Sequence, residues 1–187
     1  MESRFGIIEG VIRTRVGYAG GSTNAPTYRH IGNHTETVQV DFDPEKITFR
    51  RLLDILWDRH TYTRQTTITQ YKNAVFYQNE EQRLQAVASK QALEHRTGRE
   101  VQTDILPVES FTLAEDYHQK YLLKHSGLKS FLNRFHAHGI DIVNSTATAR
   151  LNGYAGGNGT REQLLREIHL LGLDDTEKKV LEKLVSG

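Results

Sequence analysis

The sequence predicts an α+β fold, because strand patterns and helix patterns mix along the chain without a strict β-α-β alternation. Apolar and polar residues alternate at residues 11–16 and again at residues 34–43, which is typical of half-buried strands. Helix signals occur in several other segments, and the longest of these helices is expected to end near residue 96. The chain has 187 residues, which is enough for one domain with an appendage.

Composition excludes several classes of function. The 24 basic and 23 acidic residues give a net charge of +1, so no electrostatic argument favours nucleic acid or an anionic membrane as a partner. No apolar run approaches the roughly 18 residues of a membrane helix. We expect a cytoplasmic protein, and an organellar location is also compatible. The sequence contains no cysteine, which excludes disulfides, thiolate metal sites and a cysteine nucleophile within these residues.

The start of the chain is expected to form a short helix and two strands. The first apolar residues have helical spacing: Met1, Phe5 and Ile8. The strands are VIRTRV at residues 11–16 and HTETVQVDFD at residues 34–43. Residues 17–33 are rich in Gly, Asn, Pro and Ser and are expected to form the long loop between these strands.

The middle of the chain is expected to contain a capped helix, a loop and a strand. Thr48 can cap a helix that carries five apolar residues on one stripe: Phe49, Leu52, Leu53, Leu56 and Trp57. Residues 59–72 have no clean period and are expected to form a second loop. AVFYQ at residues 74–78 is typical of a buried strand.

A second capped helix and an interrupted strand follow. Asn79 with Gln82 three residues later forms a capping-box pattern for a helix that ends near Arg96. Residues 103–110 are expected to form a strand that Pro107 interrupts, which is typical of a sheet edge or a strand end.

The C-terminal third is expected to be helical. Short helices are predicted at residues 114–123 and around residues 128–135. STATARLNGYAGGNG at residues 145–159 is rich in small residues and is expected to be a linker. Two last helices should begin at Thr160 and near residue 175.

Two loops carry polar groups that could act together. Tyr28 lies in the first loop and Glu36 near the start of a strand, while Tyr71 ends the second loop. A carboxyl group at the mouth of a sheet beside two phenols could be a general acid, kept protonated near neutral pH by burial. A glutamate near a strand start is more often a solvated charge, so spacing alone leaves both interpretations open.

A series of motifs runs through residues 1–123. In chain order these are TRVGYAGG, PTY, HTETVQVDFDP, QYKNAVFY, NEEQ and AEDYHQKYL. They occur in the order seen in the A-type peptide-methionine (S)-S-oxide reductases, and so many ordered motifs identify the chain as a member of that family. The resemblance implies a two-layer α/β sandwich with a ferredoxin-like mixed sheet and a helical C-terminal appendage.

The resemblance also implies an activity, the reduction of methionine-(S)-sulfoxide to methionine in the repair of oxidised proteins or of the free amino acid. In the family a cysteine attacks the sulfoxide sulfur, a glutamic acid protonates the leaving oxygen, and two tyrosines hydrogen-bond that oxygen. Glu36 matches the acid, Tyr28 the tyrosine of PTY and Tyr71 the tyrosine of QY. Thioredoxin or another thiol would be the reductant. No metal or organic cofactor, nucleic acid or membrane is implied.

The pentapeptide GYAGG occurs at residues 17–21 and again at residues 153–157, with unrelated flanks that exclude a duplicated domain. The first copy matches the family's VGYAGG loop. The second matches a C-terminal segment that carries a resolving cysteine in many members, and Ala155 stands at the position of that cysteine. A plain Gly-rich linker remains an alternative for this copy. We expect a reductase-like domain at residues 1–139, N-terminally incomplete, and a linker with a helical tail at residues 140–187.

The family's nucleophile lies in a GCFW segment at the start of a helix, where the helix dipole lowers the pKa of the thiol. MESRFG at the start of this chain matches the residues that follow that segment. Either the protein is a pseudoenzyme that binds oxidised peptides, or residues 1–187 are a truncated record of a longer chain. Truncation is favoured, because a missing interior strand would leave unpaired backbone edges. A selenocysteine nucleophile is a further hypothesis, and residues 1–187 by themselves are expected to be inactive.

Overall fold

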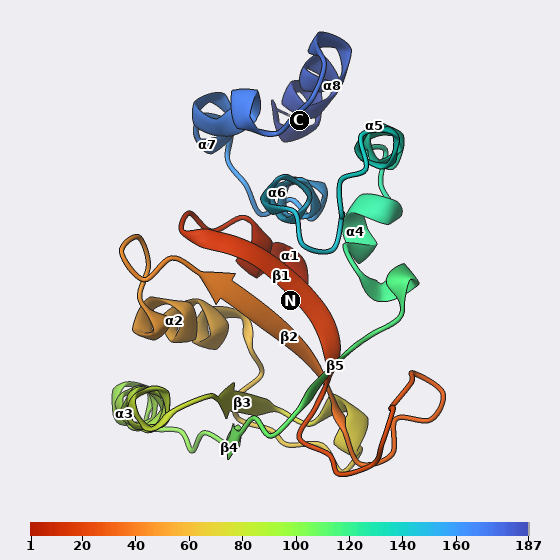
Figure 1. Cartoon of the computed structure of the whole chain (residues 1–187). Helices are drawn as coiled ribbons and strands as arrows, with labels where there is room; N and C mark the ends of the chain where they lie inside the picture. The colour runs from red at the N-terminus through yellow and green to blue at the C-terminus, as the bar shows by residue number, and fades with distance from the viewer. Residues whose placement is uncertain (187) are drawn as a thin grey trace. The chain divides into compact units, whose positions relative to one another are not determined.

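The computed structural model describes residues 1–186 and confirms the α+β fold, with strands and helices mixed along the chain (Figure 1). Contacts divide the chain into two compact units. The first unit comprises residues 1–16, 38–43 and those from 116 onward, and the second comprises residues 17–37 and 44–115. Within residues 1–186 there is no helix that combines the length and the apolar character needed to cross a membrane.

The described residues form two small sheets. The five strands are β1 (Val11–Ala19), β2 (Thr35–Phe42), β3 (Ala74–Tyr77), β4 (Asp104–Pro107) and β5 (Phe111–Leu113). One sheet has the order β2-β1-β5, with β1 and β5 antiparallel, and the other pairs β3 with β4 in parallel. The antiparallel pair of β1 with β5 and the parallel pair of β3 with β4 therefore belong to different sheets.

Pairing with a distant segment makes β1 longer than the sequence pattern predicts. The strand continues through Ala19, because Gly17, Tyr18 and Ala19 pair with β5, a strand that the sequence pattern did not reveal. The glycine is required here: a Cβ at Gly17 would lie 2.4 Å from the backbone oxygen of Thr112 and closer still to the Phe111 ring. By contrast β4 ends at Pro107 as predicted, since proline has no N–H to donate.

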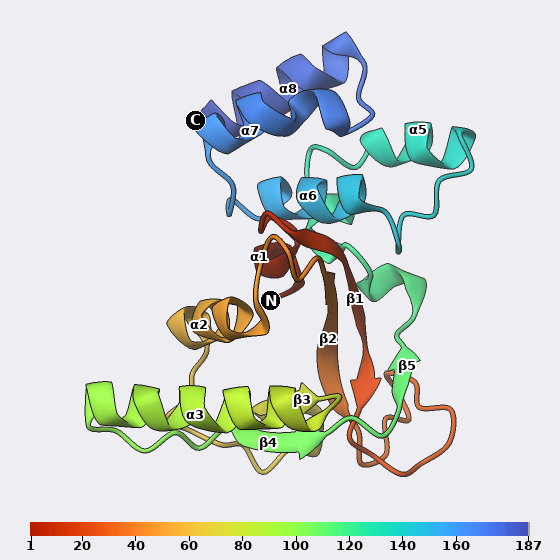
Figure 2. The same ribbon diagram turned by 60° about the vertical axis from the view of Figure 1, so that its left-hand side comes forward.

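The helices of the second unit begin at the predicted caps. In α2 (Phe49–Arg59) the Thr48 side chain accepts from the N–H of Arg51, and in α3 (Glu80–Thr97) the Asn79 side chain accepts from the N–H of Gln82. Figure 2 shows α3 lying along β3 and β4. Six buried residues form the core of this unit: Leu53, Trp57, Val75, Ala86, Leu93 and Val101.

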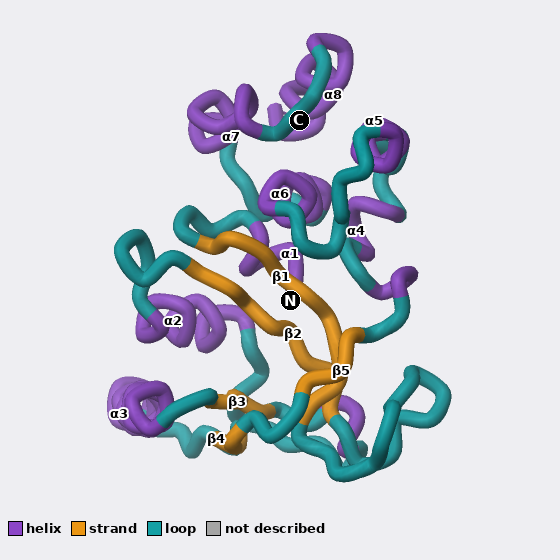
Figure 3. The backbone as a smooth tube through the Cα atoms, viewed as in Figure 1, coloured by secondary structure: helices purple, strands orange, loops and turns teal. Residues whose placement is uncertain are grey.

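The first unit is mainly helical, as the purple segments of the C-terminal third in Figure 3 make clear. Its helices are α1 (Glu2–Gly6), η2 (Asp116–His118), α4 (Tyr121–Lys124), α5 (Phe131–Ala137), α6 (Thr146–Ala155), α7 (Arg161–Glu167), η3 (Ile168–Leu170) and α8 (Asp175–Ser186). One apolar cluster joins Ile7 to residues of these helices, among them Leu123, Phe135, Leu151 and Leu181. Residues after 139 therefore share their core with the start of the chain, and the predicted boundary at residue 139 stays a prediction.

The prediction of a linker at residues 145–159 was wrong. Residues 146–155 form α6, whose first turn is capped by the side chain of Ser145. The small residues allow α6 to pack closely against α1 and do not make this segment flexible. A Cβ on Gly153 would lie 2.6 Å from the Cβ of Ile7, and a Cβ on Gly6 would lie 2.4 Å from the backbone oxygen of Ala149.

The prediction of one helix over residues 114–123 was also wrong, because Lys120 breaks it. Lys120 adopts a left-handed conformation with φ 51° between η2, which ends at His118, and α4, of which it is the N-cap residue. Its fully buried side chain donates from Nζ to Oε1 of Glu2 at 2.8 Å and to the backbone oxygen of Thr14 at 2.5 Å. Its N–H donates to the other oxygen of Glu2. The left-handed backbone of Lys120 thus interrupts the helix and places its side chain in a buried ion pair with Glu2.

Candidate active site

Glu36 is held at the start of β2 by the short turn η1 (Thr69–Tyr71). It is half-buried, and its Oε1 accepts a 2.7 Å hydrogen bond from Nε2 of Gln70. The preceding residue, Thr35, is buried and donates from its hydroxyl group to the backbone oxygen of Thr69 at 2.9 Å. One turn therefore contacts two consecutive residues of the strand.

The side chains of the two predicted tyrosines, Tyr71 of this turn and Tyr28 of the first loop, contact each other. Tyr71 ends η1, and its side chain is hydrogen-bonded to that of Tyr28 from the first loop. Tyr28 is 39% and Tyr71 52% exposed, so both phenols are open to solvent. The Tyr71 phenol also interacts electrostatically with Glu36. The structure brings the three sequence-predicted residues together within the second unit.

The hydrogen bond between Tyr28 and Tyr71 should have a measurable effect on the pKa of Tyr71. The pKa of Tyr71 is raised above its ordinary value of 10.0, chiefly by the hydrogen bond to Tyr28 and then by the Tyr28 charge, burial and Glu36. This bond is present below pH 10 and is lost as pH rises through the raised pKa. Tyr28→Phe should therefore return the pKa of Tyr71 toward its ordinary value, as followed by ¹³Cζ-tyrosine NMR. Tyr121→Phe is the control, and an unchanged Tyr71 titration in Tyr28→Phe would contradict this geometry.

Glu115 braces the loop that carries Tyr28. Its Oε1 accepts from the N–H of Tyr28 at 3.0 Å, and its Oε2 accepts from the hydroxyl group of Tyr18 on β1 at 2.6 Å. No role for Glu115 is predicted from the sequence. Its position in the AEDYHQKYL motif was visible, but nothing local indicated a partner 87 residues away.

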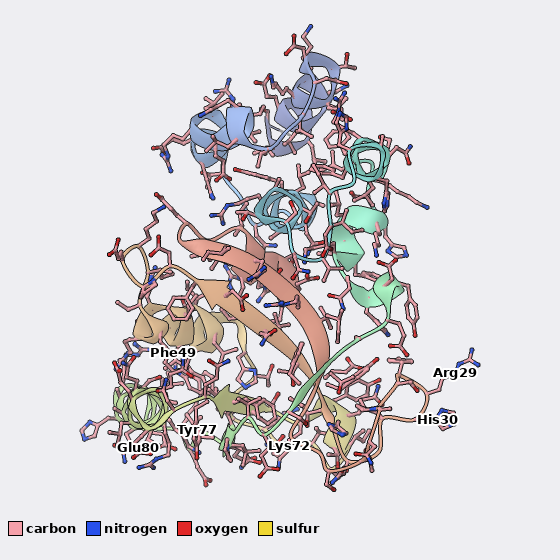
Figure 4. All side chains as sticks on the ribbon, viewed as in Figure 1. Arg29, His30, Phe49, Lys72, Tyr77 and Glu80 are labelled. Carbon is pink, nitrogen blue, oxygen red and sulfur yellow. The ribbon has the colours of Figure 1, made fainter. Side chains whose placement is uncertain are left out.

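His34 holds the same loop near its start. The buried ring accepts at Nδ1 from the N–H of Gly21, at 3.3 Å, and lies 2.8 Å from the backbone oxygen of Thr23 through Nε2. Both bonds are satisfied by a neutral ring with its proton on Nε2. Figure 4 shows the side chains of Arg29 and His30 projecting away from this loop.

The second loop is held together by hydrogen bonds of side-chain amides. Asn73 donates from Nδ2 to the backbone oxygens of Thr61 and Arg64, at 3.1 and 2.7 Å. Gln65 accepts from the N–H of Asn73 at 2.8 Å and donates to the backbone oxygen of Gln102 at 3.1 Å. These bonds fix the loop before η1, so Tyr71 and Gln70 are presented by an ordered segment.

Chemically, the site offers one carboxyl group and two phenols that can converge on an oxygen atom. Hydrogen-bond donors of this kind stabilise an oxygen that gains negative charge. Residues 1–186 contain no group of three or more His, Cys, Asp or Glu side chains that could hold a metal ion. Ala155, at the position matched to the resolving cysteine, is the last residue of α6 and packs against the core of the first unit.

Comparison with known proteins identifies the family of this chain. Residues 1–150 match the family described as peptide methionine sulfoxide reductase. The protein of that name from Drosophila melanogaster is 42% identical over 181 residues, which cover 95% of this chain and 72% of that protein. Peptide methionine sulfoxide reductase MsrA of Methanosarcina acetivorans is 40% identical over 147 residues, covering 72% of this chain and 78% of that protein.

Comparison with solved structures supports the same family. Mxr1 from Saccharomyces cerevisiae in reduced form aligns with a TM-score of 0.59 and 27% identity, over 62% of this chain and 72% of that chain. Methionine sulfoxide reductase A of Corynebacterium diphtheriae aligns with a TM-score of 0.54 and 35% identity, over 62% of this chain and 64% of that chain. The chain therefore belongs to the peptide methionine sulfoxide reductase family.

Proposed function

We propose that this chain acts on the (S)-epimer of methionine sulfoxide in proteins, peptides or the free amino acid, with Glu36 as the general acid. Methionine sulfoxide reductase activity is supported by the family and by the relatives named above. The observation that carries the residue assignment is the meeting of Tyr28, Tyr71 and Glu36 at one turn.

Each of the three groups has a role in this proposal. The hydroxyl groups of Tyr28 and Tyr71 donate to the sulfoxide oxygen, which is a strong acceptor. Attack on sulfur by a nucleophile builds negative charge on that oxygen, and Glu36 transfers its proton to it. The S–O bond breaks, the oxygen passes with the proton from Glu36 to the nucleophile as a hydroxyl group, and the thiol or selenol is thereby oxidised to a sulfenic or selenenic acid while methionine is released.

The nucleophile is not among these residues. The 187 residues contain no cysteine, so no thiol in them can attack sulfur. We propose that turnover needs a cysteine or selenocysteine that this sequence does not contain. A thiol reductant, thioredoxin in our proposal, would then reduce the oxidised nucleophile. The cytoplasmic location stays a prediction.

Binding of a sulfoxide peptide tests the residue assignment without turnover. A short peptide with methionine-(S)-sulfoxide should bind the 187-residue chain more tightly than the (R)-epimer or the reduced peptide, as measured by calorimetry. Tyr28→Phe combined with Tyr71→Phe should weaken this binding about tenfold, because two hydrogen bonds to the oxygen are lost. Tyr121→Phe, an exposed tyrosine of the first unit, is the matched control. Equal affinity of the double variant would refute the assignment.

The second candidate function is a pseudoenzyme that binds oxidised methionine without reducing it. The observation behind it is that these residues include Glu36, Tyr28 and Tyr71 but no cysteine whose thiol could attack sulfur. The intact mass of the protein isolated from its natural source discriminates the two candidates. A mass equal to that of these 187 residues supports the pseudoenzyme, and a larger mass that includes a thiol or selenol supports the reductase.

A further inference from the structure

Gln70 holds the carboxyl group of Glu36 by a direct side-chain contact. Its Nε2 lies 2.7 Å from Oε1 of Glu36, well within hydrogen-bond distance. A carboxylate oxygen can only accept a hydrogen bond, so the amide nitrogen and not the amide oxygen of Gln70 must face it. Gln70 directly precedes Tyr71, and the turn that presents a phenol therefore also holds the acid.

The turn that carries Gln70 is itself fixed. The N–H of Tyr71 donates to the backbone oxygen of Ile68 at 3.0 Å, and the N–H of Lys72 donates to that of Thr69 at 3.1 Å. The hydroxyl group of Thr35 holds the same Thr69 oxygen at 2.9 Å. The backbone on either side of Gln70 is thus held in place, and the 2.7 Å hydrogen bond to Glu36 directs the side-chain amide.

The contact distinguishes the two oxygens of Glu36. With Oε1 occupied by an N–H donor, the proton of the carboxylic acid form resides on Oε2. We propose that Gln70 is a positioning residue that reserves Oε2 of Glu36 to deliver the proton to the sulfoxide oxygen. When that proton leaves, the resulting carboxylate keeps the hydrogen bond from Gln70, which stabilises its negative charge. The inference rests on the proposed function and deepens it.

The titratable groups around Glu36 in the second unit include the two tyrosines. Tyr71 interacts with its charge, and Tyr28 is bonded to Tyr71. Lys72, the next residue on the chain, is paired with Asp104 at 2.6 Å. The ring of His34 is turned to the backbone of the first loop. Gln70 is uncharged, so its replacement by leucine removes the hydrogen-bond donor to Glu36 without adding or removing a charge beside it.

The experiment measures how binding of the methionine-(S)-sulfoxide peptide to the 187-residue chain depends on pH, by calorimetry. Binding needs the proton of Glu36, so it should fall as pH rises. Gln70→Leu removes the donor that stabilises the carboxylate, and the pH of half-maximal binding should rise by about 0.5–1 unit. Gln70→Glu places a second carboxyl group there, and the two groups would share a proton and extend binding to still higher pH.

Gln85→Leu is the matched control, because Gln85 also donates from its side-chain amide to a glutamate, Glu81, at 3.0 Å on α3, and the site does not include either residue. The control should leave the pH profile unchanged. A purely structural role of Gln70 would lower affinity equally at every pH without moving the midpoint, and that result would overturn the inference.

NMR of the side-chain amides supplies an independent readout. The ¹⁵N and ¹H resonances of the Gln70 amide should titrate in the wild type and lose that titration in Glu36→Gln. An amide that does not titrate would overturn the contact and the inference with it. If the wild type binds neither sulfoxide epimer, the proposed function falls and this inference falls with it. If it binds but Gln70→Leu follows the wild-type profile, only the inference is overturned.

Discussion

Lys120→Met is expected to destabilise the protein by about 3–5 kcal/mol, because it leaves the carboxylate of Glu2 buried without its charged partner. The Lys120 side chain is fully buried, and Glu2 is 7% exposed. Burial lowers the pKa of Lys120, and the neighbouring charge of Glu2 opposes that shift. The free energy of unfolding, measured by urea denaturation with circular dichroism, should show the loss directly.

Lys178→Met provides the control for this prediction. Lys178 pairs with Asp175 at 3.2 Å on the surface of α8, where the Asp175 side chain is 90% exposed. Exposed pairs of this kind contribute about 0–1 kcal/mol. Adding Glu2→Gln to Lys120→Met should recover part of the lost stability, since the unpaired charge is removed. Equal effects of the two lysine substitutions would show that the buried pair does not stabilise the first unit.

Gly153→Ala is expected to destabilise the protein by about 1–3 kcal/mol through overpacking between α1 and α6. The added methyl group would lie 2.6 Å from the Cβ of Ile7 and 3.0 Å from the backbone oxygen of Ser3. Neither atom is the far end of a flexible side chain, so α6 itself must shift. In a flexible linker or an exposed helix the same substitution would be neutral or stabilising by up to about 1 kcal/mol.

Gly127→Ala is the matched control. Nothing lies within 4 Å of the position its Cβ would occupy, and its φ is not in the left-handed region. Thermal and urea unfolding should separate the two variants clearly. If Gly153→Ala is as stable as Gly127→Ala, then residues 146–155 do not pack on α1 as the structure has them.

Features decided by neighbouring residues could be predicted from the sequence. The caps at Thr48 and Asn79 were correct because a side chain and an N–H three residues later suffice to form them. The strand at residues 34–43 was correct to within a residue at each end, since alternation is a local pattern. The gathering of Tyr28 with Tyr71 followed from the order of family motifs and not from spacing.

Features that depend on distant partners could not be predicted. The strand β5 exists because β1 lies beside it, and Glu115 matters because of Tyr18 and Tyr28. Small residues are ambiguous in a sequence: they permit both a flexible linker and a close helix contact, and at Gly153 the second holds. The left-handed backbone of Lys120 was hidden for the same reason, because its cause is Glu2.

Thiol-dependent turnover by the recombinant 187-residue chain is the most direct test of the account. The chain would be incubated with methionine-(S)-sulfoxide peptide and dithiothreitol or thioredoxin, and methionine formation measured by mass spectrometry. We predict binding of the peptide with no reduction, because the site holds Glu36, Tyr28 and Tyr71 but the sequence supplies no thiol. Reduction above the uncatalysed rate, abolished by Glu36→Gln, would contradict the requirement for a nucleophile outside these residues.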